Sequence, residues 1–189
     1  ATTEIYTLSL HDALPISVID ELDHALEWCE NQIIAQHQDL AQEEADLRGW
    51  FTGLLDNEGD ADTLIRRCQR IEVDAGEVIV HAGDAADSMH FILDGRVGIM
   101  VPADDGRTTR VRSLGRYTTI GEMGLVANTP RSATIQAEMP SVLYVLNTRQ
   151  FAAIRDEDPE LSHKLLTYFV SVMAERLTFA NRTIAVLRR

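Results

Sequence analysis

IGEMGL at residues 120–125, followed by PRSAT at residues 130–134, is the most informative stretch of this chain. It sets one carboxylate, Glu122, and one guanidinium, Arg131, nine residues apart around two glycines. A planar guanidinium donates paired hydrogen bonds to phosphate oxygens, and a carboxylate accepts a hydrogen bond from a sugar hydroxyl. Gly121 and Gly124 let the backbone approach a ligand closely. The pattern therefore predicts a site for a ligand that carries a phosphate beside a sugar.

Short strand-like segments surround this stretch. They are rich in β-branched residues and are separated by glycine-containing turns. The expected strands cover residues 71–73, 78–81, 89–93, 97–101, 108–114, 133–137 and 142–147. Asp94-Gly95 predicts a two-residue hairpin turn between Leu93 and Val97. Strands of this number and length favour an antiparallel, jelly-roll-like β-roll over alternating βαβ units.

Helical patterns precede and follow the strands. Residues 20–48 open with apolar side chains at spacings of three and four, which predicts an amphipathic N-terminal helix. Asp158-Pro159 is a typical helix start, a capping residue followed by proline in the first turn. From there apolar residues repeat at the same spacings as far as Leu187, which predicts a long helix that faces the roll and also suits a partner. The expected fold class is α+β.

Charge divides the chain into parts. Residues 1–17 resemble the translation of a sequencing adapter, so we exclude them from fold reasoning. Residues 18–60 carry twelve acidic side chains and one basic one, whereas residues 61–189 carry sixteen of each. We therefore expect an acidic helical leader or linker, then a β-roll domain that begins after a turn-rich break at residues 56–60. The acidic leader repels nucleic acid and anionic lipid, and its ordinary interpretation is a solvated helix face.

Composition excludes several classes of protein. Hydrophobic residues make up 45% of the chain and charged residues 25%, as in soluble globular proteins. No run approaches the roughly 20 apolar residues that span a membrane. Cys29 and Cys68 have neither metal nor redox spacing, which indicates reduced thiols and predicts a cytoplasmic location. The six histidines form no pair with ligand spacing, and no nucleophile motif is present, so we expect neither a metal site nor an enzyme.

Residues 120–134 resemble the phosphate-binding cassette of cyclic nucleotide-binding domains, whose form is aromatic-Gly-Glu-x-x-Leu, a spacer, then Pro-Arg-small-Ala. The resemblance extends over about residues 65–187, and Ile120 departs from it where an aromatic residue is common. It implies that Glu122 binds the ribose 2′-hydroxyl and that Arg131 binds the cyclic phosphate. Ligand-binding residues implied in full are Gly121, Glu122, Met123, Gly124, Arg131, Ser132 and Ala133.

The same resemblance implies a regulatory sensor whose last helix closes over the bound base. Arg176, Phe179 and Arg182 are the lid candidates. The ligand is cAMP or cGMP, and cAMP is favoured because Ser132 stands where threonine is associated with cGMP. The alternative is a scaffold for protein interaction that binds no nucleotide, with Glu122 and Arg131 paired on a solvated loop.

LDHALEWCE at residues 22–30 is similar to the last helix of the STAS domain in SulP-type anion transporters, some of which carry a cyclic nucleotide-binding domain after it. This similarity implies regulation of an upstream STAS and membrane transporter domain, at the cytoplasmic face of the inner membrane. The acidic leader and the lack of a long apolar run predict no nucleic-acid partner and no direct membrane insertion by this segment. For residues 22–30, an ordinary amphipathic helix is an open alternative. For the whole chain, a fragment of a cAMP-dependent transcription regulator is an open alternative. The last helix could also form a dimer with a second copy.

Overall fold

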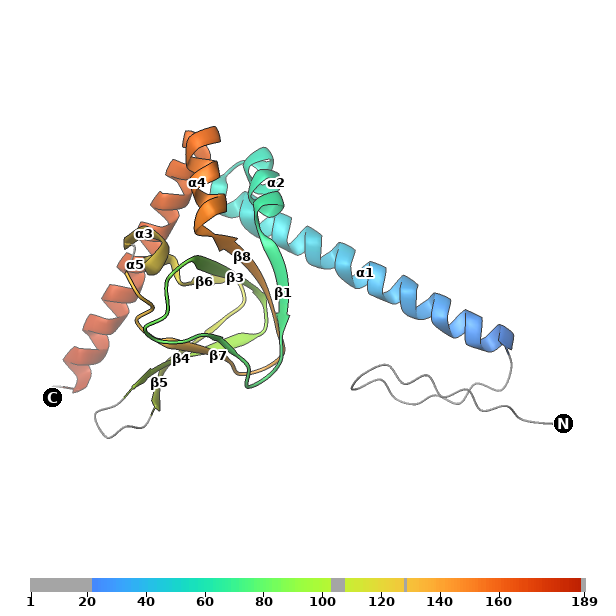
Figure 1. Cartoon of the computed structure of the whole chain (residues 1–189), viewed down its shortest axis with the longest axis horizontal. Coiled ribbons are helices and arrows are strands. Elements are labelled where there is room, and N and C mark those ends of the chain that lie inside the picture. The colour runs from blue at the N-terminus through green and yellow to red at the C-terminus, as the bar shows by residue number, and fades with distance from the viewer. Residues whose placement is uncertain (1–21, 103–107, 128, 188–189) are drawn as a thin grey trace. The chain divides into compact units, whose positions relative to one another are not determined.

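The computed structural model describes residues 22–102, 108–127 and 129–187, and it has the expected α+β architecture (Figure 1). The chain divides into two compact units, residues 1–44 and 45–189. Helix α1 spans Leu22–Leu55 and is longer than the sequence pattern predicted. Residues 1–17, with their adapter resemblance, lie outside the described residues. In the part of the chain that the structure describes, no helix is both long and apolar enough to cross a membrane.

The β-roll consists of two four-stranded sheets in which every paired neighbour is antiparallel. The first has the order β1 (Gln69–Val73), β8 (Ser141–Asn147), β3 (Ser88–Asp94) and β6 (Thr118–Ile120). The second has the order β2 (Val78–Val80), β7 (Thr134–Ala137), β4 (Arg96–Pro102) and β5 (Thr108–Gly115). Buried side chains from both sheets, including Ile92, Val97 and Leu143, form a shared core.

The turn at Asp94-Gly95 is present, but it does not close the predicted hairpin. Strand β3 pairs with β6 and β8, whereas β4 pairs with β5 and β7, so the chain passes from one sheet to the other at Gly95. Gly95 has a φ of 93°, and a Cβ there would lie 2.1 Å from Ser141 Oγ. The glycine therefore serves a close approach of two chain segments at the crossing.

The described part of the chain contains four further helices: α2 (Glu58–Arg67), α3 (Glu122–Ala127), α4 (Thr148–Glu157) and α5 (Pro159–Leu187). The predicted start of α5 is confirmed, because Asp158 Oδ1 accepts a hydrogen bond from Leu161 N at 3.0 Å. Leu161, Leu165 and Phe169 are fully buried against the roll. Leu177 is 63% exposed, so the expectation that the whole apolar stripe faces the roll is wrong beyond the first half of the helix.

The second compact unit begins before the predicted boundary near residue 60. Leu47, Phe51 and Leu55, on the last turns of α1, are buried in one core with residues of α2, β3, β8 and α5. The turn-rich residues 56–60 contain the tight turn between α1 and α2, where Asp56 has a φ of 53°. A sequence break of this kind marks a turn, and here the packed core continues across it.

Candidate functional site

Arg131 is held in place by the loop that precedes strand β3. Its backbone N–H donates to Asp84 O at 2.9 Å, and its carbonyl accepts from Gly83 N at 2.8 Å. The side chain is 4% exposed. Its Nη1 donates to Ser88 O at 2.6 Å, its Nη2 donates to Ser88 Oγ at 2.9 Å, and Nη2 lies 3.5 Å from Asp87 Oδ1. The guanidinium is therefore both buried and oriented.

Burial lowers the pKa of Arg131, whereas Asp87 and Asp84 raise it. An arginine keeps its charge in spite of such effects, so a fixed cation lies inside the roll. The imidazole of His90 on β3 is buried close to it. Burial, and next the charge of Arg131, lower the pKa of His90 to about 4, and Asp87 opposes them. His90 is therefore neutral at physiological pH, a neighbour of the cation that the sequence pattern did not identify.

Gly121 lies against the Arg131 guanidinium. It has a φ of 82°, and a Cβ at this position would lie 2.5 Å from Arg131 Nη1. Only glycine allows the guanidinium to lie directly against the backbone that leads into Glu122. Gly124 has a similar role in α3, because a Cβ there would lie 2.1 Å from Ala86 Cβ. Both glycines of the predicted motif therefore serve close approaches.

Glu122 begins α3 and is 1% exposed. Its Oε1 accepts a hydrogen bond from Arg176 Nη1 of helix α5, and Arg176 Nη2 donates to Thr119 O. Arg176, predicted as a lid residue that reaches a bound base, contacts the cassette in this structure. The alternative of a Glu122–Arg131 pair on a solvated loop is wrong here, because both side chains are buried and their ion-pair partners are Arg176 and Asp87.

Each of the two buried charged residues of the cassette has an atom without a hydrogen-bond partner among the described residues, Glu122 Oε2 and Arg131 Nε, and Thr119 Oγ1 on β6 is a third such atom. Leaving a buried polar atom unpaired costs about 1–3 kcal/mol, and more when the group is charged. Of the atoms on the two charged residues, Glu122 Oε2 is an acceptor and Arg131 Nε is a donor. The arrangement therefore suits a ligand that offers a hydroxyl to the carboxylate and an anionic oxygen to the guanidinium.

The remaining predicted site residues surround this pair in different environments. Met123 and Ser132 are exposed, whereas Gly124 and Ala133 are buried. A separate open hollow of about 460 Å³ lies between β5 and α5, lined by Arg112, Ala174, Glu175, Thr178, Phe179 and Arg182. The Arg112 guanidinium carbon lies 4.6 Å from the centre of the Phe179 ring. The structure thus brings Phe179 and Arg182 together and adds Arg112 of β5, which the sequence analysis did not assign to the site. Within the described ranges, no three histidine, cysteine or acidic side chains gather as a metal ion would require.

Comparison with known proteins agrees with this geometry. Residues 70–158 match the family model described as the cyclic nucleotide-binding domain. The fold is similar to that of a cyclic nucleotide-binding domain from Methylobacillus flagellatus, with a TM-score of 0.66 and 22% identity over 68% of this chain and 72% of that one. The regulatory domain of Toxoplasma gondii PKA, solved with cAMP, has a TM-score of 0.55 and 24% identity over 60% of this chain and 44% of that one.

Two curated relatives are proteins of different kinds. Glutaminase 1 of Bradyrhizobium diazoefficiens is 30% identical over 88% of this chain, and the match spans 27% of the glutaminase. The cAMP-activated global transcriptional regulator Vfr of Pseudomonas aeruginosa is 29% identical over 67% of this chain and 59% of the regulator. The chain thus spans about a quarter of one relative and somewhat over half of the other.

Proposed function

We propose that this chain is a sensor of cyclic nucleotides that regulates an attached or associated protein and has no catalytic role of its own. The observation that carries the proposal is that the cassette holds two buried, unpartnered atoms, Glu122 Oε2 and Arg131 Nε, and that Gly121, next to Glu122 in sequence, lies against the Arg131 guanidinium. A cyclic nucleotide presents a ribose hydroxyl and an anionic phosphate on one rigid ring system, which suits an acceptor and a donor within one cassette. The family match over residues 70–158 supports the same ligand class.

In this proposal Arg131 binds the cyclic phosphate and Glu122 accepts the ribose 2′-hydroxyl. Gly121, Met123 and Gly124 supply backbone N–H groups. Ser132 adds a hydroxyl to the phosphate, and Ala133 keeps the cassette packed. The base extends toward the hollow between β5 and α5, where Phe179 and Arg182 offer an aromatic ring and a guanidinium for stacking. Helix α5 closes over the base only if the ligand binds the closed state more tightly than the open one.

We propose cAMP over cGMP as the natural ligand. Ser132 is not the threonine that the family resemblance associates with cGMP. One relative is named as cAMP-activated, and one structural neighbour was solved with cAMP. Calorimetric titration with both nucleotides tests this preference, and tighter binding of cGMP would contradict it.

The protein that this sensor regulates stays a prediction. The similarity of residues 22–30 to a STAS helix favours an upstream anion transporter, with the sensor on the cytoplasmic side. A sensor within a transcription regulator is the alternative that the similarity to Vfr supports. A scaffold that binds no nucleotide is a further alternative, and it is supported by the contact of Arg176 with Glu122, because a side chain of the protein already uses part of the site.

The decisive experiment is calorimetric titration of the full chain with cAMP and cGMP, with Arg131→Ala as the test variant. Loss of the guanidinium removes a charged donor to the phosphate, worth about 2–4 kcal/mol, so we expect affinity to fall at least tenfold. Arg110→Ala is the matched control, because Arg110 of β5 pairs with Glu138 and not with a cassette residue. This variant should bind the nucleotide as tightly as the wild type does. Equal affinity in Arg131→Ala, or no heat from the wild type with either nucleotide, would contradict the proposal.

A further inference from the structure

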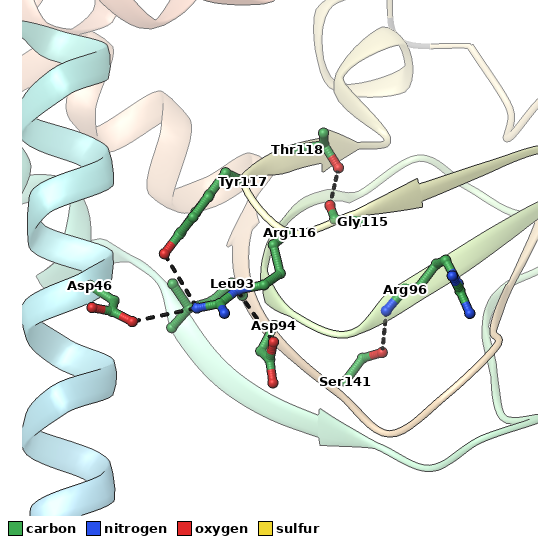
Figure 2. A network of polar contacts seen from close by, with 9 residues as sticks. All are labelled: Asp46, Leu93, Asp94, Arg96, Gly115, Arg116, Tyr117, Thr118 and Ser141. Atoms are coloured by element: carbon green, nitrogen blue, oxygen red, sulfur yellow. Dashed lines mark hydrogen bonds and ion pairs between the residues drawn. The ribbon is translucent and has the colours of Figure 1, made fainter.

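The last turns of helix α1 are attached to the turn between β5 and β6 by a polar cluster (Figure 2). Arg116, in this turn, is its centre. Its Nη2 lies 3.4 Å from Asp46 Oδ2 on α1 and 3.3 Å from Tyr117 Oη, and its Nε donates to Leu93 O at 3.1 Å and lies 3.3 Å from Asp94 Oδ1. One guanidinium thus joins the helix, the turn and the end of strand β3.

Aromatic rings strengthen the same attachment. The Trp50 ring on α1 lies 5.4 Å from the Tyr117 ring and 5.8 Å from the Phe91 ring, measured between centroids. Phe51 and Phe91 meet edge to face at 4.8 Å. Ring pairs at these separations contribute about 0.5–1.5 kcal/mol each beyond their buried area. The helix is therefore fixed to the turn by charge on one side and by ring packing on the other.

Tyr117 holds an unusual backbone conformation at the point of attachment. Its φ is 59°, in the left-handed region that bulky residues rarely adopt, and its N–H donates to Ile92 O at 2.8 Å. Such conformations persist where surrounding contacts impose them, and they gather at ligand sites and switches. Here the contacts that impose it come from Arg116, Trp50 and strand β3.

The turn leads directly into the candidate site. Only strand β6, residues 118–120, separates Tyr117 from Gly121 and Glu122. Among the strands that the structure describes, β6 is at the edge of its sheet and pairs with β3 alone. The carbonyl of Thr119, in the middle of β6, accepts the hydrogen bond from Arg176 of α5. Strand β6 is thus held at its start by α1 and at its centre by α5.

We infer that the Arg116–Tyr117 turn couples ligand binding at the cassette to the docking of helix α1. The inference rests on the proposed function. A ligand that rearranges Glu122 and its Arg176 contact also shifts β6, and β6 is too short to absorb the shift before Tyr117. The contacts of Asp46 and Trp50 with the turn then differ between the free and bound states. By reciprocity, the docking of α1 changes the affinity for the ligand.

Trp50 provides a direct test, because the chain has only one other tryptophan, Trp28. In a Trp28→Phe background, we expect cAMP to change the fluorescence of Trp50 in a saturable way, with the midpoint that calorimetry gives. Tyr117→Leu should reduce this change at least twofold, because the ring that contacts Trp50 is gone. Arg116→Ala and Asp46→Asn, which break the same ion pair from its two ends, should each alter the calorimetric affinity at least threefold.

Arg110→Ala is the control, because it removes one arginine from β5, the strand that precedes the turn. It should leave the Trp50 fluorescence change and the calorimetric affinity as they are in the wild type. Calorimetric binding without a change in Trp50 fluorescence would overturn the coupling and leave the proposed function standing. Wild-type affinity in both Arg116→Ala and Asp46→Asn would overturn it as well. Absence of heat from the wild-type chain with either nucleotide would overturn the proposed function and the coupling together.

Discussion

Gly121 is the residue on which the position of Arg131 depends. Gly121→Ala adds a Cβ that would lie 2.5 Å from Arg131 Nη1 and 3.1 Å from Ser88 O, at a φ of 82°. Gly76 has a φ of 87° but nothing within 4 Å of the Cβ position, so Gly76→Ala bears the backbone strain alone. We expect Gly76→Ala to lower the unfolding free energy by about 1–2 kcal/mol, and Gly121→Ala to lower it by at least about 1 kcal/mol more. Urea unfolding of both variants measures the difference, and equal losses would show that the guanidinium moves aside without cost.

His90 gives the molecule a specific dependence on pH. Its pKa is about 4 in the folded protein, against 6.5 for an exposed histidine. Between these values the unfolded chain binds more protons, so the contribution of neutral His90 is complete above pH 6.5 and is lost as the pH falls toward 4. Lowering the pH from 7 to 4.5 should reduce the unfolding free energy of the wild type. In His90→Gln, which has no imidazole to protonate, we expect this reduction to be smaller by about 2 kcal/mol. Parallel losses in the two proteins would contradict a buried neutral imidazole.

At the scale of elements, Arg176 attaches helix α5 to the cassette through Glu122 and Thr119 O. Arg176→Ala leaves a carboxylate that is 1% exposed without its ion-pair partner. We expect urea unfolding to show an unfolding free energy lower by about 2–4 kcal/mol. This is somewhat less than the loss for a fully buried ion pair, because Arg176 itself is partly exposed. Adding Glu122→Gln should recover part of this loss, since a neutral amide is less costly to bury than an unpaired carboxylate. Wild-type stability in Arg176→Ala would show that the pair contributes nothing to folding.

The elements also show how far the sequence predicts this fold. Alternating β-branched runs predicted most strands, and Asp158-Pro159 predicted the first residue of α5, because these signals are local. Strand β6 was not predicted, since three residues are too few to show a period. The crossing between sheets at Gly95 was not predicted either, because a glycine turn looks the same whether or not its strands pair. The motif indicated Glu122 and Arg131, but no local pattern predicted their contacts with Arg176, expected only as a lid residue, and with Ser88, because these partners are distant in sequence.

At the scale of the whole molecule, α5 exposes an apolar stripe that runs from Val170, before the middle of the helix, to Ile184. Val170, Leu177 and Ile184 are exposed at intervals of seven residues, and Ala180 lies between them. A seven-residue repeat of this kind suits a parallel or antiparallel pair of helices better than solvent. We therefore propose that two copies of the chain associate through α5, as the sequence stripe suggested. Association would place the helix that touches Glu122 inside a dimer interface, so ligand binding and dimer stability would depend on each other.

Leu177→Glu tests this association, because it places a charge at the centre of the stripe. We expect the wild type to sediment as a dimer in analytical ultracentrifugation, and Leu177→Glu to sediment as a monomer at the same concentration. Ser171→Glu is the matched control, since it adds the same charge to the same helix next to Val170 but outside the stripe, and it should remain dimeric. A wild-type monomer at all concentrations, or a Leu177→Glu dimer as stable as the wild type, would contradict the proposed interface. If saturating cAMP shifts the dimer dissociation constant of the wild type, the contact between Arg176 and Glu122 is the direct connection between the two equilibria, and Arg176→Ala should abolish that shift.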